Sequence, residues 1–468
     1  MRATSGFRTV VFFLMTSLVQ SEEWSRFRGP NGQGTSTATG FPVDFNRTKN
    51  LVWHTPLRPG KSSPVLTSKH IFLTGFENQT LYTQCFDRTT GKLLWERSEP
   101  PVQKDSVNLL NHPAAITPVT DGANVYVFFK DYGLLSYSST GKLRWRVPLG
   151  PFMNAQGIGA APILAGSLLI LQIDQLKDSY IAAYSTSSGK LRWKVAREES
   201  ESWGTPILYD RPGADLQIIT VGANYIGGHR AADGKRSFTF PGASPSMVAS
   251  PLIDGNTLYA FGYGYQTSQP FSRILQSSDK NKDGVITPDE YGTVNVLRAA
   301  GKYMGNGDGI LNEEKWKLWN EHVRGPTGLI AVDLAHASST VNPLLLWRFE
   351  RGFESVIPSP LLHQGILYSV KNGGILTAFD AKTGEVAKTG RIQGALGGYS
   401  ASPVFAEGRL YFSSEEGKVA VVRPGREWEL VQLNDLHEEI FATPALSAGK
   451  IFIRTAEALY CFGSGQRF

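Results

Sequence analysis

"ASPVFAEGRLYFSS", residues Ala401–Ser414, contains the pattern from which the fold can be predicted. A small residue and a proline precede two apolar residues, a turn, and a run in which apolar and polar residues alternate. Alternation with a period of two predicts a half-buried β-strand. The pattern occurs eight times, marked by Pro64, Pro118, Pro162, Pro206, Pro251, Pro360, Pro403 and Pro444. Six of the seven intervals between these prolines are 41 to 54 residues long, and the interval from Pro251 to Pro360 is 109 residues.

Each copy continues with two more predicted strands around a Gly-containing turn. "CFDRTTGKLLW" (Cys85–Trp95) and "SYSSTGKLRW" (Ser136–Trp145) show this part best. Glycine suits the turn because it adopts positive φ at little steric cost. Four short strands in a repeat of about 44 residues are typical of a β-propeller, in which stacked blades bury one another's faces. The sequence therefore predicts an all-β fold with eight blades.

The two ends of the chain are predicted to close the ring together. The last copy stops after its third strand, whereas "NLVWHTPL" (Asn50–Leu57) precedes the first copy. This N-terminal strand should complete the eighth blade and remove its open edge. Tryptophans recur at the blade ends, where we expect packing between blades; they are Trp53, Trp95, Trp145, Trp193 and Trp347.

The two cysteines, Cys85 and Cys461, occupy equivalent third-strand positions in neighbouring blades. Packed sheets lie about 10 Å apart, whereas a disulfide needs Cα atoms within about 7 Å. We therefore expect two buried free thiols.

Three stretches of the chain resemble a known family. "AFDAKTGE" (Ala378–Glu385) and "SSTGKLRW" (Ser138–Trp145) are similar to the pyrroloquinoline-quinone (PQQ) repeats of eight-bladed quinoprotein-type propellers. "WSRFRGPNGQG" (Trp24–Gly34) resembles the start of exported PQQ-repeat proteins of unassigned activity. The resemblance implies the fold more firmly than the activity, because one fold hosts many kinds of site. Dehydrogenases of this family typically place two adjacent cysteines beside the quinone. The two cysteines of this sequence are not adjacent, so PQQ is not the expected cofactor.

Residues 1–21 have the features of a secretory signal peptide. Arg2 and Arg8 precede an apolar run from Thr9 to Val19, and small residues follow at the expected cleavage positions. No later stretch reaches eighteen apolar residues, so no membrane span is expected. The net charge of +6 is not concentrated in any run of five Lys or Arg residues, which argues against a nucleic-acid partner. We expect a soluble protein that is exported to the periplasm or secreted, with an N-terminal extension at residues 22–49.

The long interval between Pro251 and Pro360 contains an insertion, residues 265–327, whose apolar residues have helical spacing. Blades one to five (first part) then span residues 50–264, and blades five to eight span residues 328–468. Within the insertion, "DKNKDGVITPDE" (Asp279–Glu290) fits the loop of an EF-hand, with Gly284 at the sharp turn. The predicted calcium ligands are Asp279, Asn281, Asp283, the Val285 carbonyl, Thr287 and Glu290.

A second loop, "MGNGDGILNEEK" (Met304–Lys315), matches the EF-hand pattern only in part. Met304 cannot ligate at the first place, and Lys315 replaces the closing Glu. We expect this loop to bind no metal and to have a structural role, with Leu311 lying against Ile286 of the first loop.

The loops that enter the innermost strands of a propeller surround its central funnel. Five or six residues before the repeat prolines, the chain places polar side chains that could form a ligand site there, although loop composition alone also gives a solvated rim. These candidates are Arg58, His112, Gln156, Glu201, Glu354, Glu438 and Glu439.

Two functional hypotheses follow. The first is an exported, non-catalytic propeller that binds calcium through one EF-hand and holds another envelope protein or a small ligand at its face. It is similar in fold to the scaffold propeller of outer-membrane barrel assembly, without that family's lipidation cysteine. The alternative is a PQQ-dependent periplasmic oxidoreductase. Catalytic residues are not predicted, although a hydrolase or lyase using the Glu-rich funnel would depend on Glu201 or Glu354.

Overall fold

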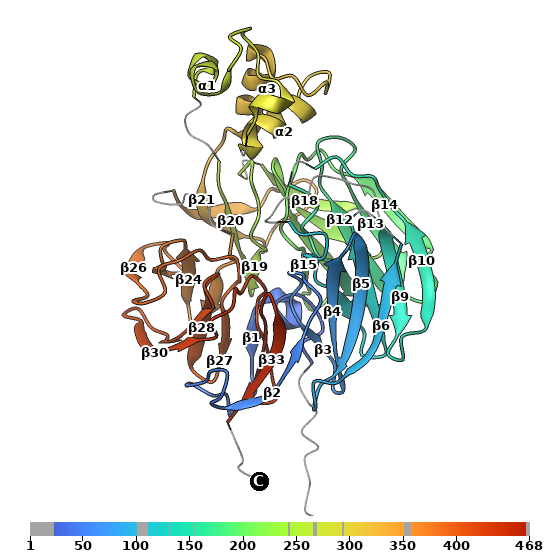
Figure 1. Ribbon diagram of the computed structural model, residues 1–468, viewed down its shortest axis with the longest axis vertical. Helices are drawn as coiled ribbons and strands as arrows, with labels where there is room; N and C mark the ends of the chain where they lie inside the picture. Colours follow the sequence, from blue (N-terminus) through green and yellow to red (C-terminus); the bar gives the residue numbers. More distant parts are fainter. Residues whose placement is uncertain are drawn as a thin grey trace, which may run out of the picture.

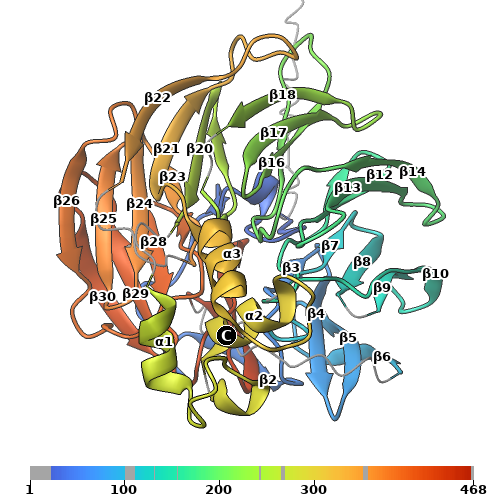
Figure 2. The same ribbon diagram turned by 90° about the horizontal axis from the view of Figure 1, so that it is seen from above.

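The chain forms a ring of eight antiparallel blades, with a small group of helices on one face of the ring (Figure 1). The computed structural model describes residues 23–100, 111–130, 132–154, 156–241, 244–264, 269–292, 294–350 and 357–464. The predicted signal peptide (1–21) and Glu354 lie outside these residues. Seen from above, the blades radiate from a common centre (Figure 2). The predicted eight-bladed β-propeller is confirmed.

Each blade contributes its strands in order from the ring's centre to its edge. Blade one contains β3 (Val65–Leu66), β4 (His70–Glu77), β5 (Thr80–Asp87) and β6 (Leu93–Glu99), and blade two contains β7 (Val119–Thr120), β8 (Asn124–Phe129), β9 (Gly133–Ser138) and β10 (Leu143–Pro148). Blade three contains β11 (Ile163–Ala165), β12 (Leu168–Ile173), β13 (Tyr180–Ser185) and β14 (Leu191–Ala196), and blade four contains β15 (Ile207–Tyr209), β16 (Gln217–Val221), β17 (Tyr225–Arg230) and β18 (Arg236–Pro241).

Blades five to eight follow the same plan. Blade five contains β19 (Leu252–Asp254), β20 (Thr257–Gly262), β21 (Gly328–Asp333) and β22 (Leu344–Phe349), and blade six contains β23 (Leu361–His363), β24 (Ile366–Lys371), β25 (Ile375–Asp380) and β26 (Val386–Arg391). Blade seven contains β27 (Val404–Ala406), β28 (Arg409–Ser413), β29 (Lys418–Arg423) and β30 (Glu429–Asp435). Blade eight contains β31 (Ala445–Ser447), β32 (Lys450–Arg454), β33 (Ala458–Gly463) and the N-terminal strand β2 (Leu51–Pro56).

Strand β2 closes the ring as predicted. It pairs antiparallel with β33, with Trp53 opposite Cys461 and Thr55 opposite Leu459. Cys85 lies opposite Trp95 at the equivalent place in blade one. Both cysteines are buried and free, as predicted.

A tryptophan of the outermost strand packs on the turn glycine of the next blade in five of the eight blades. A methyl group added to that glycine would lie 2.4 to 2.7 Å from the indole ring; the pairs are Trp53–Gly91, Trp95–Gly141, Trp145–Gly189, Trp193–Gly234 and Trp347–Gly384. Four of these indoles also donate their N–H to a backbone carbonyl of the next blade, at 2.8 to 3.0 Å. The predicted role of these tryptophans between the blades is confirmed.

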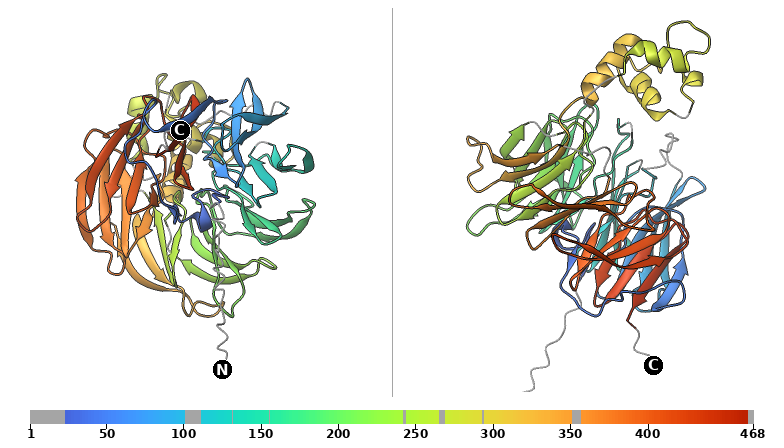
Figure 3. Two further views of the ribbon diagram at one scale, coloured as in Figure 1. Left: turned by 90° about the horizontal axis from the view of Figure 1, so that it is seen from below. Right: turned by 90° about the vertical axis from the view of Figure 1, so that its left-hand side faces the viewer.

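The segment before β2 runs through the centre of the ring, which the repeat pattern did not predict. Trp24 exchanges two backbone hydrogen bonds with Leu66 of blade one. Strand β1 (Thr35–Ser36) then adds parallel to β27 of blade seven. A 3₁₀ turn, η1 (Pro30–Gly32), lies between them. In the view from below, this N-terminal segment crosses the middle of the ring (Figure 3, left).

The insertion between β20 and β21 forms three short helices, α1 (Phe271–Ser278), α2 (Asn295–Tyr303) and α3 (Glu313–Val323). We call residues 269–323 the helical module. It has its own core, which includes Phe271, Trp316 and Trp319. Where the chain leaves and re-enters the blade, Gly264, Gly325 and Pro245 approach so closely that a side chain on either glycine would clash. The module projects from one face of the ring (Figure 3, right).

Within the described residues, no helix is long and apolar enough to cross a membrane.

Candidate functional site: the central cavity and the helical module

A ring of hydroxyl groups surrounds the centre of the propeller. The residue before each repeat proline lies at the start of an innermost strand, and its backbone N–H donates to the side-chain hydroxyl of the corresponding residue in the next blade. Seven such bonds of 2.9 to 3.2 Å are present, among Ser63, Thr117, Ala161, Thr205, Ser250, Ser359, Ser402 and Thr443. Because Ala161 has no hydroxyl, the bond from Thr117 is missing. The small residue of the repeat therefore links neighbouring blades at the axis.

These residues line a cavity of about 350 Å³. Phe27 from the N-terminal segment also lines it, together with the aromatic side chains of Trp203, Tyr263 and Phe441. The ammonium of Lys61 lies 3.5 Å from the centre of the Phe441 ring, and burial lowers the pKa of Lys61. Such a cavity offers hydroxyl donors, aromatic faces and one cationic side chain, which suits a small polar or anionic group.

The N-terminal segment is held in the channel by two buried arginines. Arg26 donates to the carbonyl of Pro206 at 2.6 Å, and Arg28 donates to the carbonyl of Pro360 at 2.7 Å. Burial lowers the pKa of each guanidinium to about 9. The acceptors belong to two repeat prolines, so the motif residues of blades four and six also fix this segment.

The funnel-rim candidates that the structure describes have different surroundings. Gln156 lines it. Arg58 instead makes ion pairs with Glu77 and Glu96 and lies over the Tyr82 ring. The imidazole of His112 packs edge-on against Phe76 and accepts a hydrogen bond from the Ala114 N–H; its burial lowers its pKa to about 4.

The glutamates of the predicted rim also lie apart. Glu438 is buried and accepts hydrogen bonds from Thr455 and Tyr460, whereas Glu439 is exposed. Glu201 is buried against the helical module. The sequence spacing did not specify these different side-chain directions.

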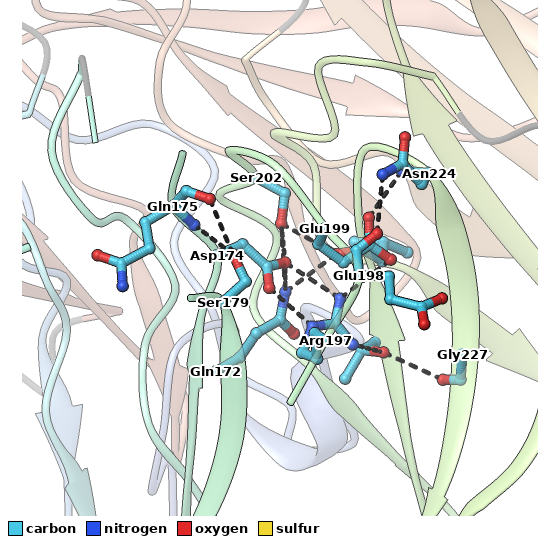
Figure 4. A network of polar contacts seen from close by, with 12 residues as sticks. Gln172, Asp174, Gln175, Ser179, Arg197, Glu198, Glu199, Ser202, Asn224 and Gly227 are labelled. Atoms are coloured by element: carbon cyan, nitrogen blue, oxygen red, sulfur yellow. Dashed lines mark hydrogen bonds and ion pairs between the residues drawn. The ribbon is translucent and has the colours of Figure 1, made fainter. Parts of the chain in front are cut away.

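The loop between blades three and four is anchored by a buried ionic network (Figure 4). Arg197 makes two bonds with Asp174, of 2.7 and 3.1 Å, and lies 3.6 Å from Glu199. Asp174 also accepts from Gln172 and Ser202. Burial raises the pKa of Glu199 to about 7, and the Arg197 charge opposes this shift. No sequence motif signalled this network, because its charged members come from loops after two separate strands, β12 and β14.

This anchored loop connects the cavity with the helical module. Trp203 lines the cavity and donates its indole N–H to the Gly157 carbonyl at 2.9 Å. Glu201, two residues earlier, lies 3.7 Å from His322 of α3. Leu176 of blade three packs against the core of the module. In the view from above, α2 and α3 lie over the middle of the ring (Figure 2).

In the first loop of the module, two of the carboxylates predicted to bind calcium accept several hydrogen bonds. The Asp279 carboxylate accepts from the N–H groups of Lys282 and Gly284, at 2.7 and 3.0 Å. The Glu290 carboxylate accepts from Lys280 and from both the N–H and the hydroxyl of Thr287, at 2.8 to 2.9 Å. These donors, led by Thr287, lower the pKa of Glu290 to about 2. The Glu290 carboxylate is thus held inside the loop in the charged form that metal binding requires.

The two loops of the module pair through Ile286 and Leu311, which exchange backbone hydrogen bonds of 2.9 and 2.8 Å. This is the contact predicted from the sequence. In the described part of the chain, no three His, Cys, Asp or Glu side chains cluster as a metal site. The calcium ligand set read from the sequence therefore stays a prediction.

Comparison with known proteins agrees with this architecture. A family model described as outer membrane protein assembly factor BamB matches residues 77–274 and 317–466, most of the chain. The chain belongs to this family. Between the two matched ranges, residues 275–316 are unmatched, and they fall within the helical module.

A curated relative, the outer membrane protein assembly factor BamB of Shewanella oneidensis, is 22% identical over 360 residues, covering 72% of this chain and 78% of the relative. Among solved structures, BamB of Moraxella catarrhalis superposes with a TM-score of 0.58 at 11% identity, covering 88% of this chain and 99% of that one. A europium-containing methanol dehydrogenase gives a TM-score of 0.57 at 11% identity, covering 94% and 98%. At these identities, the structural likeness shows the fold alone.

Proposed function

We propose that this chain is an exported, non-catalytic scaffold that holds another envelope protein at the face carrying the helical module. The family match supports this proposal, because the named relatives are outer membrane protein assembly factors. The signal-like residues 1–21 support export. The module adds exposed apolar side chains to that face, including Ile310 and Leu318.

The chemistry of the central cavity is the observation that carries the non-catalytic part of the proposal. Of the described residues that line the cavity, only Lys61 and Tyr263 have ionisable side chains. General acid–base catalysis needs a positioned donor and acceptor with matched pKa values, and the lining residues that the structure describes include no carboxylate or imidazole. It therefore suits binding better than proton transfer.

The alternative is a PQQ-dependent oxidoreductase, favoured by the fold shared with a methanol dehydrogenase. The residues present do not fit the quinone well. Among the described lining residues, Lys61 alone has a cationic side chain for a ligand with several carboxylates, and the buried Cys85 and Cys461 belong to different blades. Reconstitution with PQQ and Ca²⁺, followed by dye reduction with alcohols and sugars, separates the two functions. We expect no turnover; a bound quinone spectrum with substrate-dependent turnover contradicts the scaffold.

We also propose that the first loop of the module binds one calcium ion. Asp279, Asn281, Asp283, the Val285 carbonyl, Thr287 and Glu290 supply about the six to eight hard oxygens that Ca²⁺ prefers. Extracellular calcium modules work at dissociation constants of about 10⁻⁴–10⁻³ M, so the ion stabilises the module continuously rather than acting as a switch.

Calorimetric titration of the mature chain tests the calcium site. We expect one equivalent of Ca²⁺, which the combined substitutions Asp279→Ala and Glu290→Gln abolish. Asp289→Asn is the matched control, because Asp289 is an acidic neighbour outside the ligand pattern. No binding to the unsubstituted chain, or unchanged binding to the double variant, contradicts this site.

Cross-linking in the native envelope, followed by purification of the chain, tests the scaffold directly. We expect a stoichiometric envelope-protein partner. If the chain is recovered alone under these conditions, the scaffold proposal fails.

A further inference from the structure

The second loop of the helical module, Met304–Lys315, retains several features of a metal-binding loop. Asp308 stands at its fifth place, Gly309 at the turn, and the carbonyl of Ile310 at the seventh place. Asp308 already accepts from the N–H of Ile310 at 2.8 Å and from Asn306 at 2.8 Å. The loop is therefore shaped around a group of oxygens, although Met304 and Lys315 replace two expected ligands.

The side chain of Lys315 fills this loop. Lys315 is only 5% exposed. Its ammonium contacts the Asp308 carboxylate, donates to the Ile310 carbonyl at 2.9 Å, and lies 3.5 Å from the Gly301 carbonyl. Asp308 and Ile310 are the residues whose oxygens would ligate a metal at the fifth and seventh places. A buried ammonium surrounded by such oxygens has the partners that a buried charge requires.

The loop also provides space for the lysine stem. Gly305 has φ of +62°, and a methyl group added there would lie 3.1 Å from Cε and 3.3 Å from Cγ of Lys315. A larger residue would therefore crowd the stem as well as strain the backbone.

We propose that the Lys315 ammonium is the permanent cation of the second loop, taking the place that calcium would occupy there. The second loop is then held closed without metal, and the module takes up a single ion in the first loop. This inference rests on the proposed calcium site for the ion count, but not for the role of Lys315 itself.

Closure of the second loop by Lys315 can influence the first loop, because the two loops are paired. Ile286 and Leu311 exchange two backbone hydrogen bonds, and the Tyr291 hydroxyl donates to the Gly309 carbonyl. Tyr291 follows the closing Glu290 of the first loop. A second loop closed by Lys315 therefore holds the first loop near its folded conformation before calcium arrives, which lowers the ordering cost of binding.

Amide hydrogen exchange of the mature chain in chelator tests the role of Lys315 without any metal. Lys315→Met keeps a long apolar stem but removes the charge, and Lys317→Met on the exposed side of α3 is the matched control. We expect the amides of Ile286 and Leu311 to exchange about fivefold to tenfold faster in Lys315→Met. This factor corresponds to the loss of one hydrogen-bonded ion pair in which one partner is half exposed. Equal exchange in the two variants overturns the proposal.

Calcium stoichiometry tests the second part. The unsubstituted chain should bind one ion, and the double variant Met304→Asp with Lys315→Glu, which restores the first and closing ligands, should bind two. A count of two in the unsubstituted chain, or of one in the double variant, contradicts the idea that Lys315 excludes metal. If the unsubstituted chain binds no calcium, the proposed first site fails, whereas faster exchange of Lys315→Met in chelator still supports the tethered cation.

Discussion

The contact between tryptophan and glycine in neighbouring blades can be tested within one blade by comparing Gly189→Ala with Gly166→Ala. Both glycines lie in turns of blade three and have positive φ, of +71° and +60°. A methyl group at Gly189 would lie 2.7 Å from Cε3 of Trp145, whereas one at Gly166 would meet no atom within 4 Å. The pair therefore separates backbone strain from loss of the contact.

The expected free energies of unfolding follow from these geometries. An alanine in the left-handed region costs about 1–2 kcal/mol at either position. At Gly189, the methyl group must also displace Trp145, which is 8% exposed and bonded to the Thr186 carbonyl at 3.0 Å. Overpacking costs about 1–3 kcal/mol, and the hydrogen bond contributes about 1 kcal/mol. We expect Gly189→Ala to lose about 3–6 kcal/mol and Gly166→Ala about 1–2 kcal/mol.

Equilibrium unfolding in urea, followed by tryptophan fluorescence and circular dichroism, measures both losses. If the slope of unfolding free energy against urea concentration is the same in both variants, the differences between their unfolding midpoints report differences in stability. Losses that agree within about 1 kcal/mol, the size of a single hydrogen bond, would show that the tryptophan contact does not hold the blades together.

Three other predictions follow from the same structure. Ser359→Ala removes the acceptor of the buried Ser250 N–H and should lower the free energy of unfolding by about 1–3 kcal/mol. Ala161→Ser completes the ring of hydroxyl hydrogen bonds and should raise that free energy by about 1 kcal/mol. If urea unfolding shows that both substitutions change the stability in the same direction, the proposed role of the hydroxyl ring is contradicted. The Glu199 pKa of about 7 lies above its ordinary value of 4.5, so the folded form holds the proton longer and stability falls as pH rises from 4.5 to 7. Glu199→Gln should flatten this part of the pH profile of unfolding, and a persisting slope would assign it to other groups. The hydrogen bond from Lys315 lowers the pKa of Asp308 to about 2; NMR titration should show it moving toward about 3.9 in Lys315→Met, and an unmoved value argues against the contact.

The repeat made most of the fold predictable. Each small residue and proline marks an innermost strand, and the strand missing after Phe462 pointed to β2 as its replacement. The tryptophans at the blade ends could be assigned to blade contacts for the same reason. The expected pairing of the two EF-hand-like loops likewise predicted that Leu311 lies beside Ile286.

The candidate site was predictable only in part. The segment Trp24–Gly34 occurs once, so no repeat register could place Arg26 and Arg28 inside the channel. The rim loops are irregular, and spacing does not fix which way Arg58 or Glu201 points. The network of Asp174 and Arg197 joins residues that follow two different strands, β12 and β14, and their separation in the sequence offered no sign of the contact.

Site-specific photo-cross-linking in the native envelope tests the scaffold account most directly. A photoreactive residue at Leu318 of α3, which is 39% exposed, reports on the module face, and one at Leu191, 53% exposed on β14, reports on the outer edge of the ring. We predict an adduct with one envelope protein from Leu318, weakened when Asp279→Ala and Glu290→Gln remove the calcium site, and none from Leu191. No adduct from Leu318, or equal adducts from both positions, would contradict a scaffold that uses its calcium-bearing face.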